Sequence, residues 1–177
     1  MIASYWLLIA ILGQELILTK SQTNLPASPQ ETDYEMDRIE ESCQKPGNCS
    51  WYSLCLEKSY PNCANSENYA ISYGLHFCDR YAERLDRFSD SGQKWVGRVQ
   101  ECLQVALIPY LNKDNRLSCE RLKEKAFYTH APCYVNSGFC KLGIRDWFEM
   151  LVTVAPAYKM ATKKMMKATI EGLRLCV

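Results

Sequence analysis

Cysteine is the residue type in this sequence with the greatest capacity for chemistry. A cysteine can bind a metal ion, attack an electrophile or form a disulfide bond, and number and spacing help to decide which. There are ten, at Cys43, Cys49, Cys55, Cys63, Cys78, Cys102, Cys119, Cys133, Cys140 and Cys176. The even number favours five disulfides. Ten cysteines allow roughly 900 pairings, so spacing alone does not give the connectivity.

Metal binding and covalent catalysis find little support in the spacing. A zinc site usually takes two of its ligands from a short motif such as Cys-x2-Cys. The sequence has no such pair, and its only histidines are His76 and His130. A nucleophile needs an orienting base, and both histidines lie in helical patterns beside core residues such as Phe77 and Phe127. We therefore expect no metal, no cofactor and no enzymatic activity.

A secreted phospholipase is the nearest enzyme class, because such enzymes can be helical and rich in cysteine. That class needs a His-Asp pair beside cysteines on one helix and a glycine-rich calcium loop. Asp79 follows Cys78 here, but His76 precedes them at the wrong spacing. Residues 112–115 lack the calcium-loop pattern, and there is no Gly-x-Ser-x-Gly, phosphate-binding loop or His-Glu-x-x-His motif.

The first residues of the chain indicate its compartment. An apolar run over residues 6–12 is too short to span a bilayer and suits a signal peptide over residues 1–13, cleaved after Gly13. The alternatives are a buried N-terminal helix or, if the run extends to Leu18, an uncleaved anchor. Residues 14–42 are polar and acidic, and we expect a flexible arm there. Secretion would allow the cysteines of residues 43–177 to oxidise.

Composition limits the remaining function classes. The chain has 177 residues, of which 47% are hydrophobic, enough for one domain with a core. Its net charge of +1 argues against a chain-wide nucleic-acid interface. Asn48-Cys49-Ser50 fits the N-glycosylation motif, with Asn48 as the acceptor. Bridging of Cys49 before a glycan is added would compete with that modification.

Helical periodicity recurs from residue 43 to the end, and no segment needs a strand. The expected helices span residues 51–58, 68–88, 93–111, 116–129, 142–154 and 157–176. Ser50 is the expected N-cap of the first, and Asp90 or Ser91 that of the third. The sequence therefore predicts an all-α, disulfide-rich domain of five to six helices.

Prolines and turn residues divide these helices. Pro132 and Pro156 should end the segments that precede them, and Pro109 should end or kink the third. Residues 133–140 should form a short loop with Ser137-Gly138 as its turn. Gly97 is either tolerated within its helix or permits a close helix crossing.

Apolar stripes predict which faces of the helices are buried. One stripe follows the second helix at Tyr73, Phe77, Tyr81, Leu85 and Phe88, and another follows the fifth at Ile144, Trp147, Phe148 and Leu151. The last helix combines methionines with lysines. Such a helix can bind a membrane, heparin or a partner groove, or it can pack with a solvated basic face.

One stretch resembles a known family. Cys78 is followed by an aromatic-rich helix, by the sequence from Phe88 through Gly92, Lys94 and Trp95 to Val96, and by Cys102, 24 positions after Cys78. Cys119, Cys133 with Tyr134, and Cys140 follow at intervals of 14 and 7 positions. This pattern resembles the stanniocalcins, secreted glycoprotein hormones, and the resemblance extends from Cys43 to Cys176.

The resemblance implies a mostly helical fold and a specific pairing: Cys43–Cys55, Cys49–Cys78, Cys63–Cys119, Cys102–Cys133 and Cys140–Cys176. Family members regulate calcium and phosphate handling, and some inhibit pappalysin-type metalloproteinases. They are usually homodimers linked through a further C-terminal cysteine. Because this sequence stops at Val177, we do not expect a covalent dimer.

Two functional hypotheses follow. The first is a secreted, hormone-like regulatory glycoprotein that binds an extracellular receptor or protease. The alternative is a saposin-like lipid- or membrane-binding helical module that uses the methionine-rich basic helix.

Overall fold

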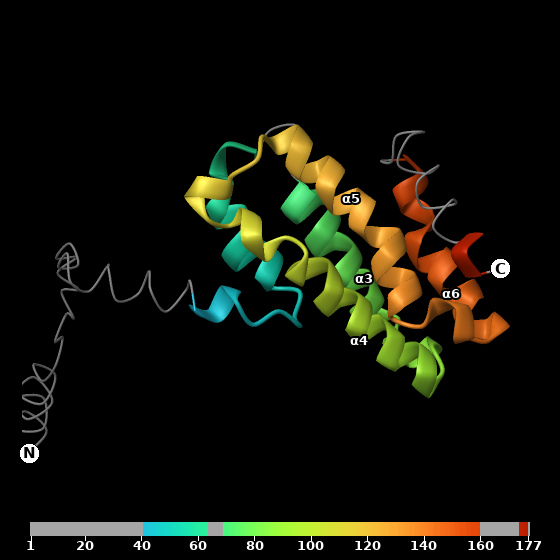
Figure 1. Cartoon of the computed structure of the whole chain (residues 1–177). Helices are drawn as coiled ribbons and strands as arrows, with labels where there is room; N and C mark the ends of the chain where they lie inside the picture. The colour runs from blue at the N-terminus through green and yellow to red at the C-terminus, as the bar shows by residue number, and fades with distance from the viewer. Residues whose placement is uncertain (1–40, 64–68, 160–173, 177) are drawn as a thin grey trace, which may run out of the picture. The chain divides into compact units, whose positions relative to one another are not determined.

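The computed structural model describes residues 41–63, 69–159 and 174–176. These residues are predominantly helical, and no strand occurs among them, so the expectation of an all-α, disulfide-rich domain is confirmed. The expected signal peptide, nearly all of the acidic arm and most of the last helix lie outside the described residues. The helices α3 to α6 are labelled in Figure 1.

The first helices are irregular. Two π-helical segments, Tyr52–Glu57 and Ala70–Leu75, lie side by side. Gly74 permits this approach, because a Cβ atom there would collide with the ring of Tyr52. Ser50 does not cap the first segment as expected, since its hydroxyl donates to the side chain of Asn48.

The expected second helix is shorter than its periodicity suggested. After the π-helical segment, α3 spans His76–Glu83, and a 3-10 turn, Leu85–Arg87, ends the run. Phe88 is then extended but buried. The core positions Phe77, Tyr81 and Phe88 were therefore predicted correctly, although one continuous helix was not.

Helix α4 spans Asp90–Val105, and its N-cap is Ser89 in place of the expected Asp90 or Ser91. The Ser89 hydroxyl accepts a hydrogen bond from the backbone N–H of Gly92. The helix ends before Pro109, which lies in the 3-10 turn Ile108–Tyr110. A further 3-10 turn, Lys113–Asn115, leads towards α5.

Helix α5 spans Cys119–Asn136, capped by Ser118, and the expectation that Pro132 would end it was wrong. A proline inside a helix costs about 3 kcal/mol. Burial of Cys133 and Tyr134 just beyond it, with the bond from Cys133 to α4, offsets that cost. The expected loop over residues 133–140 is thus helical in its first half, and Gly138 turns the chain with φ +101°.

Helix α6, Ile144–Val154, follows the 3-10 turn Phe139–Lys141. The helix was expected, but its apolar spacing does not mark its buried face. Asp146, Met150 and Thr153 are buried, while Ile144 and Phe148 are exposed. The helix ends at Val154, and a 3-10 segment, Ala155–Lys159, continues through Pro156. Near the C-terminus only Arg174–Cys176, also 3-10, is described.

The core has two parts. The N-terminal cluster contains Trp51, Tyr52, Leu56, Leu107, Leu122, Ala126 and Phe127 among its buried residues. The C-terminal cluster contains Tyr81, Phe88, Trp95, Val99, Tyr134, Phe139 and Met150. Helices α4 and α5 pack against each other (Figure 1), and α5 contributes to both clusters whereas α4 contributes to the C-terminal one.

Five disulfides tie these elements together. They join Cys43 to Cys55, Cys49 to Cys78, Cys63 to Cys119, Cys102 to Cys133 and Cys140 to Cys176. These are the pairs that the resemblance implies. The last one fixes residue 176 beside the turn that precedes α6. No helix among the described residues is both long enough and apolar enough to cross a bilayer.

Candidate functional site

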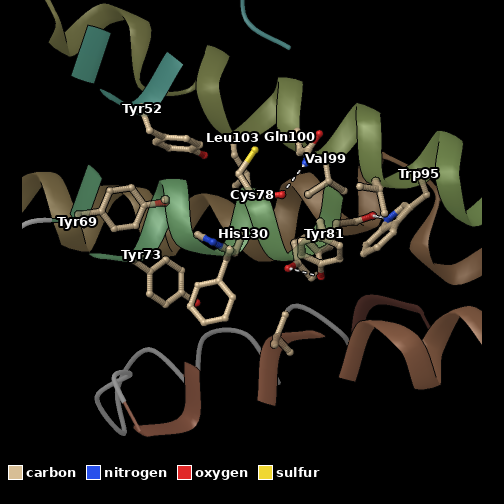
Figure 2. A pocket seen from close by; sticks show the side chains of 15 residues that line it. Tyr52, Tyr69, Tyr73, Cys78, Tyr81, Trp95, Val99, Gln100, Leu103 and His130 are labelled. Carbon is tan, nitrogen blue, oxygen red and sulfur yellow. Dashed lines mark hydrogen bonds between the residues drawn. The ribbon is translucent and has the colours of Figure 1, made fainter. Parts of the chain in front are cut away.

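A small aromatic cavity lies where the two clusters meet. Its volume is about 40 Å³, and tyrosine side chains from several elements line it, together with His130 (Figure 2). They are Tyr52, Tyr69, Tyr73, Tyr81 and Tyr134. Pockets for drug-sized ligands measure about 300–1,000 Å³, so this cavity has room for only a few water molecules.

The groups around this cavity are held in neutral forms. The ring of His130 stacks on Phe127, and its Nδ1–H donates to the carbonyl of Ala126 at 2.8 Å. Burial lowers the pKa of His130 to about 4, although its backbone hydrogen bonds act in the opposite direction. Burial likewise raises the pKa of Tyr81, whose hydroxyl lies 3.3 Å from that of Tyr134. Neither group is poised to act as a charged acid or base near neutral pH.

The two histidines do not meet a nucleophile. His130 bonds to backbone, and the exposed His76 lies edge-on to Phe77. Among the described residues, no three His, Cys, Asp or Glu side chains gather in a group that could hold a metal ion. The observed contacts of the two histidines are hydrogen bonding to the backbone and ring packing.

Part of the stretch that carries the family resemblance forms a structural joint with α6. Asp146 of α6 is 1% exposed, and its carboxylate accepts hydrogen bonds from the backbone N–H of Ser89 at 2.8 Å and from its hydroxyl at 2.7 Å. Ser89 in turn caps α4 through Gly92. We call Ser89, Gly92 and Asp146 the α4–α6 joint. One buried carboxylate thereby fixes the start of α4 against the first turn of α6.

Gly92 belongs to this joint because nothing larger fits. A Cβ atom at position 92 would collide with the carboxylate of Asp146. Gly97, the glycine for which a close helix crossing was considered, is exposed and has no atom near its missing Cβ. The close approach in α4 is therefore at Gly92, five residues earlier than that alternative placed it.

Trp95 and Phe88 fill the core beside the joint. Trp95 is fully buried, and its indole N–H donates to the backbone carbonyl of Tyr134 at 3.1 Å (Figure 2). Phe88 is 2% exposed and packs against Tyr81. The stretch from Phe88 to Trp95 thus supplies an N-cap, a close helix contact and two core rings.

Asn48 lies in a loop anchored to α4. The fully buried Gln104 accepts a hydrogen bond from the backbone N–H of Gly47 at 2.7 Å and donates one to the backbone carbonyl of Asn48 at 2.8 Å. The side chain of Asn48 is exposed, and Ser50 donates to it. A glycan on Asn48 would therefore project into solvent. Cys49, the middle residue of the motif, is bonded to Cys78.

Sequence reasoning missed three polar residues that organise these sites. Gln104 and Asp146 are buried, and Arg98 donates two hydrogen bonds to the carbonyl of Ser137 at 3.1 and 2.8 Å. Polar residues in helices are usually solvated, so nothing in the pattern distinguished them. For Asp146, the flanking apolar residues gave a misleading signal.

Comparisons with known proteins add no identification. No family model matches the chain, and neither the curated proteins nor the solved structures contain a match. The family resemblance thus depends on the cysteine spacing and the motif alone.

Proposed function

We propose that this chain is a secreted regulatory protein of stanniocalcin type, which acts by binding an extracellular protein and not by catalysis. The observation that carries the proposal is the disulfide framework. Its five pairs are those that the resemblance implies, and bridges occur in both core clusters. Five disulfides in a chain of 177 residues fit an oxidising compartment.

The interior supports a binding role over a catalytic one. The aromatic cavity is too small for a metabolite, and His130 is buried and neutral. The residues most specific to the resemblance, Phe88, Gly92 and Trp95, are used for packing. Function would then depend on the shape and charge of the exterior, as it does for hormone-like ligands. The partner would be an extracellular receptor or a protease.

All ten cysteines lie in bridges within the chain, and none is free to link two copies. We therefore propose a monomer or a non-covalent dimer.

Asn48 is the proposed glycosylation site. Removal of N-linked glycans should reduce the mass of the secreted protein, and the Asn48→Gln variant should show no such reduction. A wild-type mass that glycosidase leaves unchanged would contradict this assignment.

The test is a binding and inhibition assay with the full chain purified from the medium of secreting cells. A pappalysin-type metalloproteinase and its growth-factor binding protein serve as the probe for the protease branch. Saturable binding to cultured cells that changes calcium or phosphate uptake serves for the receptor branch. Slower proteolysis, or such saturable binding, is the expected result.

The absence of both effects at micromolar protein would contradict the proposal. Retention of the chain in the cytosol with reduced thiols would also contradict it. The alternative of a saposin-like lipid- or membrane-binding module has weaker support where it needs an enclosed lipid, because a cavity of about 40 Å³ cannot enclose an acyl chain. The methionine-rich helix of that alternative lies almost entirely outside the described residues.

A further inference from the structure

Helix α6 exposes three of its apolar residues to solvent and buries two of its polar residues in the core. Ile144 is 86% exposed, Phe148 62% and Leu151 47%. Spacings of four and three residues place them on one face, which we call the α6 stripe. On the opposite face Asp146 and Thr153 are almost fully buried. An ordinary amphipathic helix on a protein surface buries such an apolar stripe, although other apolar residues of α6, such as Met150, are buried here.

Specific bonds hold α6 in this orientation. Asp146 accepts from Ser89 within the α4–α6 joint. Glu149 is ion-paired with Arg84, and the carbonyl of Thr153 accepts from Arg80 Nε at 3.1 Å. Rotating the helix to bury the stripe would break all of these contacts. The outward direction of Ile144, Phe148 and Leu151 is therefore built into the fold.

The exposed charges on α6 and on two turns close to its start are mostly positive. Arg145 on α6 donates from Nε to the carbonyl of Arg87 at 2.9 Å, which brings Arg87 to the start of the helix. Lys141 precedes the helix in the turn Phe139–Lys141. The exposed charges of α6 and of the turns 85–87 and 139–141 are Asp86, Arg87, Lys141 and Arg145, three cations and one anion, or +2.

We propose that the α6 stripe and its cationic rim, which consists of Arg87, Lys141 and Arg145, dock on the surface of an anionic lipid bilayer. Isoleucine, phenylalanine and leucine on one helix face can enter the boundary between head groups and acyl chains, while nearby arginine and lysine meet lipid phosphates and carboxylates. Such docking is peripheral and goes beyond the proposed binding of a protein partner. It would concentrate the secreted protein at cell surfaces.

The test measures partition of the full secreted chain onto vesicles. The probes are vesicles of phosphatidylcholine containing about one quarter phosphatidylserine, and vesicles of phosphatidylcholine alone. We expect binding to the first kind that weakens as salt rises. Phe148→Ser should weaken this binding by about tenfold, because it removes the apolar ring that inserts into the bilayer. A tenfold loss corresponds to about 1.4 kcal/mol. Lys141→Gln should weaken the binding by a smaller factor.

Val105→Ser is the matched control, because Val105 is an apolar residue of α4 that is 49% exposed. It should bind within about twofold of wild type. Phe148→Trp gives a second readout, since its added fluorescence should shift to shorter wavelength on anionic vesicles only.

Three results would overturn the proposal. One is no vesicle association at low salt, which would mean that a protein or another part of this chain covers the stripe. Another is association that Phe148→Ser leaves unchanged, which would place the contact elsewhere. The third is an equal loss in Val105→Ser. The binding and inhibition assay of the proposed function is run without vesicles, so its outcome is separate from these.

Discussion

The two core clusters are held together by different means. The N-terminal cluster packs π-helical and 3-10 segments against α3 and the first half of α5, and three of the five disulfides cross-link it: Cys43–Cys55, Cys49–Cys78 and Cys63–Cys119. The C-terminal cluster is built on α4, α6 and the second half of α5. These helices are positioned by the remaining two bridges and also by polar contacts such as the α4–α6 joint.

The difference teaches how such a small domain divides its stabilisation. Short irregular helices leave backbone groups poorly satisfied and have little intrinsic stability. Covalent links compensate by restricting the unfolded chain. Longer, capped helices supply their own hydrogen bonds and need fewer links. The N-terminal cluster should therefore depend on oxidation more strongly than the C-terminal cluster does.

The largest effect should come from removing one bridge of the N-terminal cluster. Replacing Cys63 and Cys119 by serine opens a link across 56 positions and should cost about 4 kcal/mol of unfolding free energy. Replacing Cys102 and Cys133, which are 31 positions apart on the packed helices α4 and α5, should cost less, about 3.7 kcal/mol, because the loop that this bridge closes is shorter. Urea unfolding of both double variants measures the difference. Equal losses, or a greater loss for the second pair, would break the comparison.

The next effect concerns His130, where the clusters meet. Its pKa is about 4 in the folded protein, against 6.5 for an ordinary histidine, because burial disfavours the imidazolium. Above about pH 6.5 both states are neutral and the group makes no difference. Between about pH 6.5 and pH 4 only the unfolded chain binds the proton. The free energy of unfolding therefore decreases as the pH is lowered, by about 3 kcal/mol in total. Below that range no further loss arises from this group.

Unfolding free energies at about pH 7, 5 and 4 check this expectation. His130→Gln should remove most of this acid-dependent loss, whereas His76→Gln, at an exposed histidine, should retain it. If His130→Gln lost as much stability on acidification as wild type, the buried neutral histidine would not be the cause.

A smaller effect should appear at the α4–α6 joint. Gly92→Ala places a methyl group against the carboxylate of Asp146 and should cost about 2 kcal/mol. Gly97→Ala is the matched control on the same helix. Its site is open, so it should stabilise the protein by about 0.5–1 kcal/mol through helix propensity. Thermal unfolding of the pair is sufficient, and a destabilisation by Gly97→Ala as large as that by Gly92→Ala would refute the joint.

The smallest effect should be at the α6 stripe. Phe148→Ser should change the unfolding free energy by less than about 0.5 kcal/mol, because the ring is 62% exposed. Met150→Ala on the same helix should cost about 3 kcal/mol, because that side chain is 4% exposed. Denaturant unfolding compares the two variants. A loss of several kcal/mol in Phe148→Ser would mean that the stripe is buried in solution.

Much of the scaffold was predictable from the sequence. Periodicity located the helices, and it predicted the buried rings of Phe77, Tyr81, Phe88 and Trp95. The boundaries were less predictable, because tertiary contacts overrode local signals. Helix α5 continues through Pro132 because residues beyond the proline are buried. Ser89 is the N-cap of α4, and its hydroxyl also donates to Asp146.

The candidate sites were harder to predict from the sequence. The exposure of the α6 stripe depends on Asp146, Glu149 and Thr153 finding partners on other elements, which no periodicity contains. Gln104 was hidden for the same reason, since its partners at residues 47 and 48 are far away in sequence. Spacing indicated five bridges but not their connectivity, which the family resemblance supplied.

The central claim is a secreted helical scaffold with one specific set of five bridges. Mapping the disulfides by mass spectrometry on protein from the medium tests it most directly. We predict peptides linking Cys43 to Cys55, Cys49 to Cys78, Cys63 to Cys119, Cys102 to Cys133, and Cys140 to Cys176, with no free thiol. A bridge between Cys133 and Cys140, or several reduced cysteines, would contradict the account.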